Sequence, residues 1–268
     1  MFDPFNDIES AGYLRNRFRE QDPRIIKRIE HELFIRNLKK AVSHLANKPT
    51  LSYEDFLAVH KILFGEFYSW AGQDRLATAP HLLVSKAGTQ FCEPPTIRLA
   101  VDQGLRLAQH QNRMPEAAGE IMGLFAYGHP FLDGNGRTML IIHMELAHRA
   151  GFSVDWPATT KTDYLSALAR EIEWPGRGIL DQYLQPFVGP QVYRGQLVDS
   201  AVAMRGLDGL DDENQIEGDL RDESVAEKYR QFDKARNYSY QLANVDQKQA
   251  NDIDQDNDED QEPGPSLG

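Results

Sequence analysis

The side chains of this sequence that could act together on a phosphate lie in one nine-residue stretch, HPFLDGNGR, which runs from His129 to Arg137. An unperturbed histidine has a pKa of about 6.5, so at neutral pH His129 can accept a proton from an incoming hydroxyl group. Asp133 offers hard carboxylate oxygens, which suit a Mg²⁺ ion that is bound together with substrate phosphates. These residue types predict a general base at His129 and a magnesium ligand at Asp133.

The second half of the stretch has the features of a phosphate-binding loop. Gly134 and Gly136 lack a Cβ atom, which allows a left-handed backbone and a close approach of N–H groups to a ligand. We expect a helix to begin directly behind them, and the N-terminus of a helix favours an anion. Asn135 can donate an amide hydrogen to a phosphate oxygen, and Arg137 presents a forked set of donors. The whole stretch therefore predicts in-line attack of a hydroxyl group on a nucleotide phosphorus.

Two predicted helices must hold this stretch between them. Residues 121–125 are typical of the end of a buried helix and residues 137–146 of the start of another. Within the connection, Pro130 is expected to stiffen the backbone and Phe131 to anchor the loop on the core. Ser52 and Asp55 resemble a capping box at the start of an earlier helix. Apolar residues at helical spacing predict a mainly α fold, with helices at residues 24–46, 52–64, 97–109, 115–127, 137–150, 162–172 and 180–187.

The helical pattern is interrupted between residues 76 and 95. Two short extended segments, Leu82 to Val84 and Gln90 to Cys92, flank the turn sequence Lys86-Ala87-Gly88-Thr89. This order predicts a β-hairpin, which is the only β element we expect. An irregular loop is the alternative interpretation of the same residues.

The charge of the chain is concentrated towards its C-terminal end. The 268 residues include 29 basic and 41 acidic side chains, a net charge of −12, and residues 195–268 hold 7 of the basic and 19 of the acidic ones. A neutral body with an acidic tail argues against nucleic-acid binding, which requires clustered Lys and Arg. We expect one domain over residues 1–190. Over residues 191–268 we expect an acidic, low-complexity extension that is largely disordered and at most partly helical, near residues 222–240.

The cysteine count and the hydropathy pattern bear on the cellular setting. Cys92 is the single cysteine, so neither an intrachain disulfide nor a multi-cysteine zinc site can form. The first residues lack the basic start and apolar run of a secretory signal, and no run of about 18 apolar residues occurs. We therefore expect a soluble, cytoplasmic protein without a membrane partner.

The active stretch resembles the signature of the Fic (filamentation induced by cAMP) family, HxFx(D/E)GNGR, at every fixed position. Residues 67–75, FYSWAGQDR, resemble a second motif of that family, and the resemblance covers roughly residues 10–190. It implies a Fic fold and a nucleotidyltransferase that moves AMP from Mg-ATP to a Ser, Thr or Tyr hydroxyl of a target protein. It also implies a bacterial toxin or effector, while export into another cell and the oligomeric state stay open.

The resemblance implies a role for each part of the site. His129 would deprotonate the target, Asp133 would hold Mg²⁺, and residues 134–137 would hold the phosphates. The hairpin would act as a flap that aligns the main chain of the target. The flap residues are Leu83, Val84, Ser85, Lys86, Gln90 and Phe91.

One position departs from the adenylylating members of the family. They commonly carry a second Arg three positions after the first, where this chain has Leu140. A leucine cannot bind the γ-phosphate, so three alternatives stay open: a Doc-like protein phosphotransferase with an inverted nucleotide, a donor other than ATP, and a catalytically silent binding module. Gly134 and Gly136 favour AMP transfer, because Doc-like loops usually have Ala and Lys there. The family's inhibitory motif, S/T-x-x-x-E-G/N, has no convincing copy, which leaves regulation by a separate antitoxin, by the acidic extension, or none.

Overall fold

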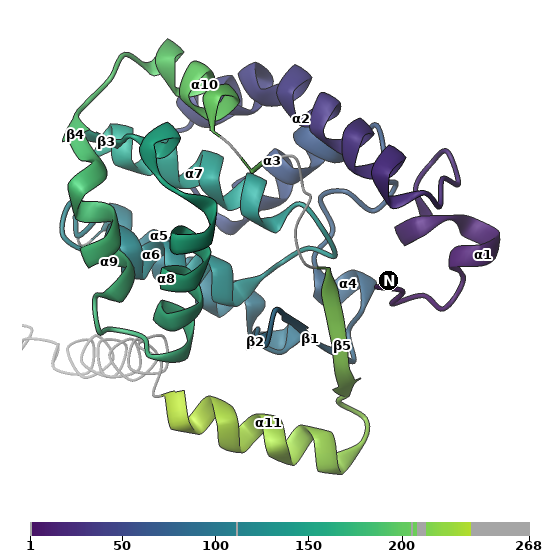
Figure 1. The fold of residues 1–268 in the computed structure, drawn as a ribbon. Helices are drawn as coiled ribbons and strands as arrows, with labels where there is room; N and C mark the ends of the chain where they lie inside the picture. Colours follow the sequence, from purple (N-terminus) through teal and green to yellow (C-terminus); the bar gives the residue numbers. More distant parts are fainter. Residues whose placement is uncertain (1, 111, 205, 208–212, 237–268) are drawn as a thin grey trace, which may run out of the picture.

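A computed structural model describes residues 2–110, 112–204, 206–207 and 213–236 of the chain. Its elements are mainly helices (Figure 1). The α-helices are α1 (Ile8–Ala11), α2 (Pro23–Ala46), α3 (Tyr53–Phe64), α4 (Arg75–Thr78), α5 (Ile97–Gln109), α6 (Ala118–Gly128), α7 (Asn135–Arg149), α8 (Lys161–Glu173), α9 (Ile179–Leu184), α10 (Arg194–Ala203) and α11 (Glu223–Arg236). The strands are β1 (Leu82–Lys86), β2 (Thr89–Gln90), β3 (Phe152–Val154), β4 (Val188–Pro190) and β5 (Asn214–Asp219). Short 3-10 helices lie at Tyr13–Arg15, Pro94–Thr96, Trp156–Ala158 and Gln185–Phe187.

Helices α6 and α7 form the centre of the molecule, and the predicted active stretch connects them. Most residues of α6 are buried, from Ile121 to Gly128 without a break, because other helices surround it. Helix α6 packs against α5, α8 and α9, while α7 packs against α2 and α3. The loop between α6 and α7 is therefore fixed at both ends by the core, as a site that must hold its geometry requires.

The helices begin where local sequence signals place them. Asp22 caps α2 by accepting a hydrogen bond from the backbone N–H of Arg24 (2.8 Å), and Pro23 occupies the first turn. The predicted capping box of α3 is present, with the Ser52 N–H donating to the Asp55 carboxylate at 2.9 Å. The prediction of a mainly α fold is thus confirmed. Two starts differ from it by more than one residue, since α6 begins at residue 118 and α7 at residue 135, and α1, α4 and α10 were not predicted.

The predicted hairpin forms, but it is not the only β structure. Strands β1 and β2 pair antiparallel across a turn in which Ala87 and Gly88 both have positive φ, of 48° and 80°. Strand β5 pairs antiparallel with the other edge of β1, so this sheet has the order β2-β1-β5. Strands β3 and β4 form a second, two-stranded sheet. The expectation of a single β element is therefore wrong, because polar strands such as β5 give no hydrophobic alternation to detect.

The C-terminal part of the chain also contributes to the folded body. We expected residues 191–268 to be helical at most in part, whereas residues 214–219 form β5. Leu197 and Ala201 of α10 and Tyr229 of α11 are buried against the rest of the molecule. A domain boundary at residue 190 stays a prediction, and residues 237–268 lie outside the described residues. None of the described helices is both long and apolar enough to cross a membrane.

Candidate active site

His129 ends helix α6 in a strained backbone conformation. Its φ of 40° and ψ of 59° lie in the left-handed region, which is unfavourable for a residue with a side chain. The buried guanidinium of Arg75 supports this turn, because its Nε donates to the carbonyl oxygen of His129 at 2.8 Å. The imidazole is 7% exposed and stacks on Phe91, with ring centroids 3.6 Å apart. Both the backbone and the ring of His129 are therefore held in one position.

The surroundings of His129 keep its ring neutral. Burial lowers the pKa of the imidazole well below its usual value, and the positive charges of Arg75 and Lys86 lower it further. Asn214 fixes which ring nitrogen carries the proton. Its amide nitrogen donates to the carbonyl oxygen of Leu132 (2.9 Å), so its amide oxygen faces Nε2 of His129 at 3.2 Å. An amide oxygen can only accept, so Nε2 carries the hydrogen and donates it.

Asp133 is ionised and already has two partners. Its Oδ1 accepts the N–H of Gly134 at 2.6 Å, and its Oδ2 accepts from Nζ of Lys27, also at 2.6 Å. Burial opposes the charge of this carboxylate, but Lys27 and Arg137 outweigh it and hold the pKa of Asp133 well below its usual range. Lys27 comes from α2, so a helix more than a hundred positions earlier supplies the counter-ion of the predicted metal ligand.

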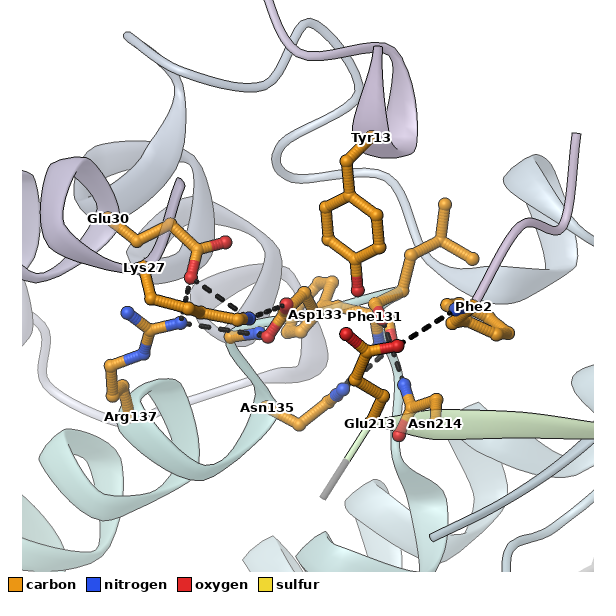
Figure 2. Close-up of polar contacts among 12 residues, drawn as sticks. Phe2, Tyr13, Lys27, Glu30, Phe131, Asp133, Asn135, Arg137, Glu213 and Asn214 are labelled. Atoms are coloured by element: carbon orange, nitrogen blue, oxygen red, sulfur yellow. Dashed lines mark hydrogen bonds and ion pairs between the residues drawn. The ribbon is translucent and has the colours of Figure 1, made fainter. Parts of the chain in front are cut away.

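Arg137 lies at the wall of the site but is paired with a buried carboxylate. Its guanidinium is almost fully buried, donates to Oε2 of Glu30 at 3.1 Å, and lies 4.6 Å from the ring centroid of Phe64. Glu30 also accepts from Lys27 (3.2 Å) and from the hydroxyl of Tyr68. Figure 2 shows Glu30 and Asp133 on either side of Lys27, with Arg137 beside them. Direct phosphate binding by Arg137 stays a prediction, since in this arrangement its donor Nη2 is committed to Glu30.

The remaining loop residues divide into structural and accessible ones. Both side-chain polar atoms of Asn135 bond to the backbone of Phe131, at 2.8 and 2.7 Å, so the donation of this amide to a phosphate stays a prediction. Phe131 itself is fully buried and stacks on His60 (3.8 Å between centroids), and the carbonyl of the buried Pro130 accepts from the N–H of Arg75. These contacts close the loop on itself and on the core.

Only one of the two glycines has the expected left-handed backbone. Gly134 has a φ of 77°, and a Cβ there would lie 2.6 Å from Cε2 of Phe64. Gly136 lies in the first turn of α7, its backbone is helical, and a Cβ there would meet nothing within 4 Å. The open space beside Gly136 is the side from which a ligand can approach the N-terminus of α7.

A cavity of about 410 Å³ lies in front of these residues. This volume is within the range of small-molecule sites in proteins. Gly134 and Gly136 lie on its wall, and His129 and Asp133 also line it. Apolar side chains of α7 and α8 continue the wall, and Leu140 is among them. The flap contributes Lys86 and Phe91, whereas Leu83, Val84 and Ser85 are buried; Gln90 is half-buried.

Sequence reasoning missed several residues that shape this site. Lys27, Glu30 and Asn214 come from elements far from the loop in sequence, and no local pattern marks them. Tyr68 and Arg75 do carry a signal, because both belong to the stretch FYSWAGQDR that resembled a second family motif. Their contacts explain that motif physically: Tyr68 donates to Glu30, and Arg75 donates to backbone carbonyls at the end of α6.

Comparisons with known proteins identify relatives of this chain. A family model described as Fic/DOC family matches residues 50–147, which include the loop and the flap. The protein adenylyltransferase VbhT of Bartonella schoenbuchensis is 29% identical over 174 residues, which are 62% of this chain and 35% of VbhT. The chain thus spans about a third of the length of VbhT. The probable protein adenylyltransferase y4lH of Sinorhizobium fredii is 26% identical over 166 residues, 59% of this chain and 82% of that protein.

Solved structures show the same fold at low sequence identity. The Fic domain of Bep8 from a Bartonella species superposes with a TM-score of 0.56 at 16% identity, over 68% of this chain and 93% of that one. BepC of Bartonella tribocorum, solved with bound AMPPNP, gives a TM-score of 0.52 at 20% identity, over 66% of this chain and 92% of that one. Residues 50–147, which contain the loop and the flap, thus belong to the Fic/DOC family.

Proposed function

We propose that this protein is a protein adenylyltransferase, which transfers AMP from Mg-ATP to the hydroxyl group of a Ser, Thr or Tyr residue of another protein. The observation that carries the proposal is the buried, neutral imidazole of His129 on the wall of a nucleotide-sized cavity that also contains the N-terminus of α7. The flap lies beside this cavity, and the edge of β1 that now pairs with β5 is where a protein substrate would add a strand.

The phosphates of the nucleotide are proposed to lie at the start of α7. There the free N–H groups and the helix dipole favour negative charge, and the missing side chain of Gly136 leaves room for it. The apolar end of the cavity, between α7 and α8, suits a purine base. BepC was solved with AMPPNP and a related Fic domain of Bartonella quintana with ADP, which supports a nucleotide in this fold.

The residues present fit a Mg²⁺ ion that arrives with the nucleotide. Among the described residues no group of three or more His, Cys, Asp or Glu could hold a metal alone. Asp133 supplies one ionised carboxylate on the cavity wall, and Mg²⁺ is commonly bound by one or two carboxylates together with substrate phosphates and water. In that position the ion would neutralise charge on the phosphates and the leaving group. Lys27 would then have to release Oδ2 of Asp133.

The reaction follows from the position of His129. A ring nitrogen of His129 takes the proton from the acceptor hydroxyl, and the resulting oxygen attacks the α-phosphorus. The bond between the α- and β-phosphates breaks, and pyrophosphate leaves with the electron pair. The dipole of α7 stabilises the charge that develops on the phosphoryl oxygens. Glu30 and Arg137 hold Asp133 and the first turn of α7 in place during this step.

Phosphoryl transfer is the second candidate, because Leu140 is buried at the cavity wall where a second Arg would otherwise bind the γ-phosphate. Labelled ATP distinguishes the two reactions. We expect label from the α-phosphorus, and none from the γ-phosphorus, to enter protein when the chain is incubated with cell lysate and Mg²⁺. Transfer of label from the γ-phosphorus would show that the protein is a phosphotransferase and not an adenylyltransferase. Bound nucleotide without transfer of either label would favour a binding module.

The biological role is proposed to be that of a toxin or effector that is restrained until needed, either by a separate antitoxin or by the chain itself. Expression of the wild-type chain should slow growth or alter the host cell, and His129→Ala should not. Equal phenotypes of the two variants would count against catalysis as the cause.

A further inference from the structure

The edge of the flap that a target would use is occupied by the chain's own strand β5. Residues of β5 pair antiparallel with all of β1, from Leu82 opposite Asp219 to Lys86 opposite Asn214. An exposed strand edge binds an extended peptide by adding it to the sheet through main-chain hydrogen bonds. Figure 1 shows β5 beside β1, with β2 on the far side and α11 following along the border of the molecule.

The first residue of β5 reaches the catalytic base. Oδ1 of Asn214 lies 3.2 Å from Nε2 of His129, the distance at which an acceptor hydroxyl would be deprotonated. Figure 2 shows Glu213 and Asn214 entering the site beside Asp133 and Asn135, with Glu213 bonded to the backbone N–H of Phe2 (3.2 Å).

Asn214 also chemically disables the base. Because its amide oxygen accepts from Nε2, that nitrogen carries the proton and has no lone pair for a substrate hydroxyl. A serine, threonine or tyrosine hydroxyl in the same place could donate to Nε2 when the hydrogen of the ring is on Nδ1, because Nε2 then has a free lone pair. An asparagine cannot be adenylylated at oxygen in this way, so it occupies the acceptor position without reacting.

Strand β5 is held in a way that permits its release. Three consecutive side chains, Gln215, Ile216 and Glu217, are exposed, and Ile216 is 44% exposed. The strand therefore buries little apolar surface and depends mainly on its main-chain pairing.

Helix α11 fastens the strand to the opposite side of the hairpin. The hydroxyl of Tyr229, a residue that is 3% exposed, accepts the N–H of Glu93 at 2.9 Å, and Arg236 donates to the carbonyl oxygen of Gln90 at 2.6 Å. Residues 214–236, which we call the C-terminal arm, thus grip both edges of the flap. Loosening α11 should release β5 without opening the helical core.

We propose that the C-terminal arm is a pseudosubstrate: β5 takes the place of the target's acceptor segment, and Asn214 takes the place of the residue that is modified. This inference rests on the proposed adenylyltransferase function. It defines the target chemically as an extended segment that pairs antiparallel with β1 and carries its hydroxyl residue opposite Lys86. Activity towards other proteins requires that such a segment displace the arm.

Replacing Asn214 by serine tests this directly, because it turns the pseudosubstrate into a substrate. The hydroxyl of the new serine would give its proton to His129, its oxygen would bond to the α-phosphorus of ATP, and pyrophosphate would leave. We expect Asn214→Ser to gain one AMP at residue 214, detected by intact mass and peptide mapping, at a rate that does not depend on protein concentration. The matched control is Gln215→Ser, whose hydroxyl belongs to the next residue of the same strand and should stay unmodified.

A second variant keeps the test decisive if the new serine is badly placed. Tyr229→Ala should free the arm and raise the labelling of lysate proteins by about ten- to a thousandfold, as expected when a minor open state becomes the major one. Tyr193→Ala removes a tyrosine that is 80% exposed and serves as its control.

The outcomes separate the inference from the function on which it rests. If Tyr229→Ala labels lysate proteins while Asn214→Ser stays unmodified, the function stands and the pseudosubstrate register is wrong. If Tyr229→Ala labels no more than the wild type, the arm is not inhibitory. If no variant transfers label although all bind nucleotide, the proposed function fails and the pseudosubstrate fails with it.

Discussion

Replacement by alanine should have opposite effects on stability at the two glycines of the loop, Gly134 and Gly136. Gly134 has a φ of 77°, and a Cβ there would lie 2.6 Å from Cε2 of Phe64 and 3.1 Å from Nε2 of His60. A left-handed alanine costs about 1–2 kcal/mol and an overpacked core position about 1–3 kcal/mol. We therefore expect Gly134→Ala to lower the free energy of unfolding by about 2–5 kcal/mol.

The substitution Gly136→Ala should instead raise the free energy of unfolding. Its backbone is helical and a Cβ would meet no atom within 4 Å, so alanine should stabilise the helix by about 0.5–1 kcal/mol. The same methyl group would project into the space proposed for the phosphates. We expect the affinity of Gly136→Ala for Mg-AMPPNP to fall at least about tenfold, equivalent to about 1.4 kcal/mol.

Two measurements on the same pair of variants check this reasoning. Urea unfolding followed by circular dichroism gives the stability, and titration calorimetry with Mg-AMPPNP gives the nucleotide affinity. If Gly136→Ala binds the nucleotide as tightly as the wild type, the phosphates do not lie at the start of α7. If Gly134→Ala is as stable as the wild type, the strain and crowding assigned to this residue are wrong.

Three further predictions follow from the buried charges. Glu30→Gln should destabilise the fold by about 3–5 kcal/mol in urea unfolding, because Lys27 and Arg137 would share Asp133 as their one remaining carboxylate and one buried positive charge would be uncompensated; an unchanged midpoint would contradict this. The acid limb of transfer activity should lie below pH 6.5, since burial, Arg75 and Lys86 all lower the pKa of His129 and the neutral ring is the active form; a rate–pH profile with a midpoint above 6.5 would refute it. Burial lowers the pKa of His143 to about 4, so between about pH 6.5 and pH 4 the unfolded chain binds a proton that the folded chain does not. The free energy of unfolding should therefore fall by about 1.4 kcal/mol for each pH unit in that range. In His143→Gln this dependence on pH should be weaker, as urea unfolding at several pH values would show.

The sequence predicted the elements whose signals are local. Apolar spacing located α2, α5 and α8 to within about one residue at each end, and the capping box located α3. The start of α7 was placed two residues too late. The predicted start at Arg137 relied on the apolar pattern, whereas the helix begins at Asn135 because Gly134 takes the left-handed conformation at its N-cap.

The parts of the site that escaped prediction depend on tertiary contacts. Nothing in the sequence of α2 marks Lys27 and Glu30 as partners of a loop more than a hundred residues away. Strand β5 reads NQIEGD, a polar segment in an acidic region, and its strand conformation comes from pairing with β1 rather than from its own residues. Local rules therefore identified the loop between α6 and α7 as the candidate site, while the groups that surround its charges came from the fold.

Both groups that act in the proposed reaction have hydrogen-bond partners in the free chain, and in that proposal a substrate or a metal ion replaces each partner. A buried polar group without a hydrogen bond is costly, so the ring of His129 and the carboxylate of Asp133 need partners even before substrates bind. Asn214 serves the first and Lys27 the second. A target hydroxyl can take the place of Asn214, and a metal ion can take the place of Lys27, so each substitution exchanges one interaction for another. Displacement of the C-terminal arm by a true target should therefore require little free energy at His129 and Asp133. The affinity of the edge of β1 for the incoming segment should then decide which proteins are modified.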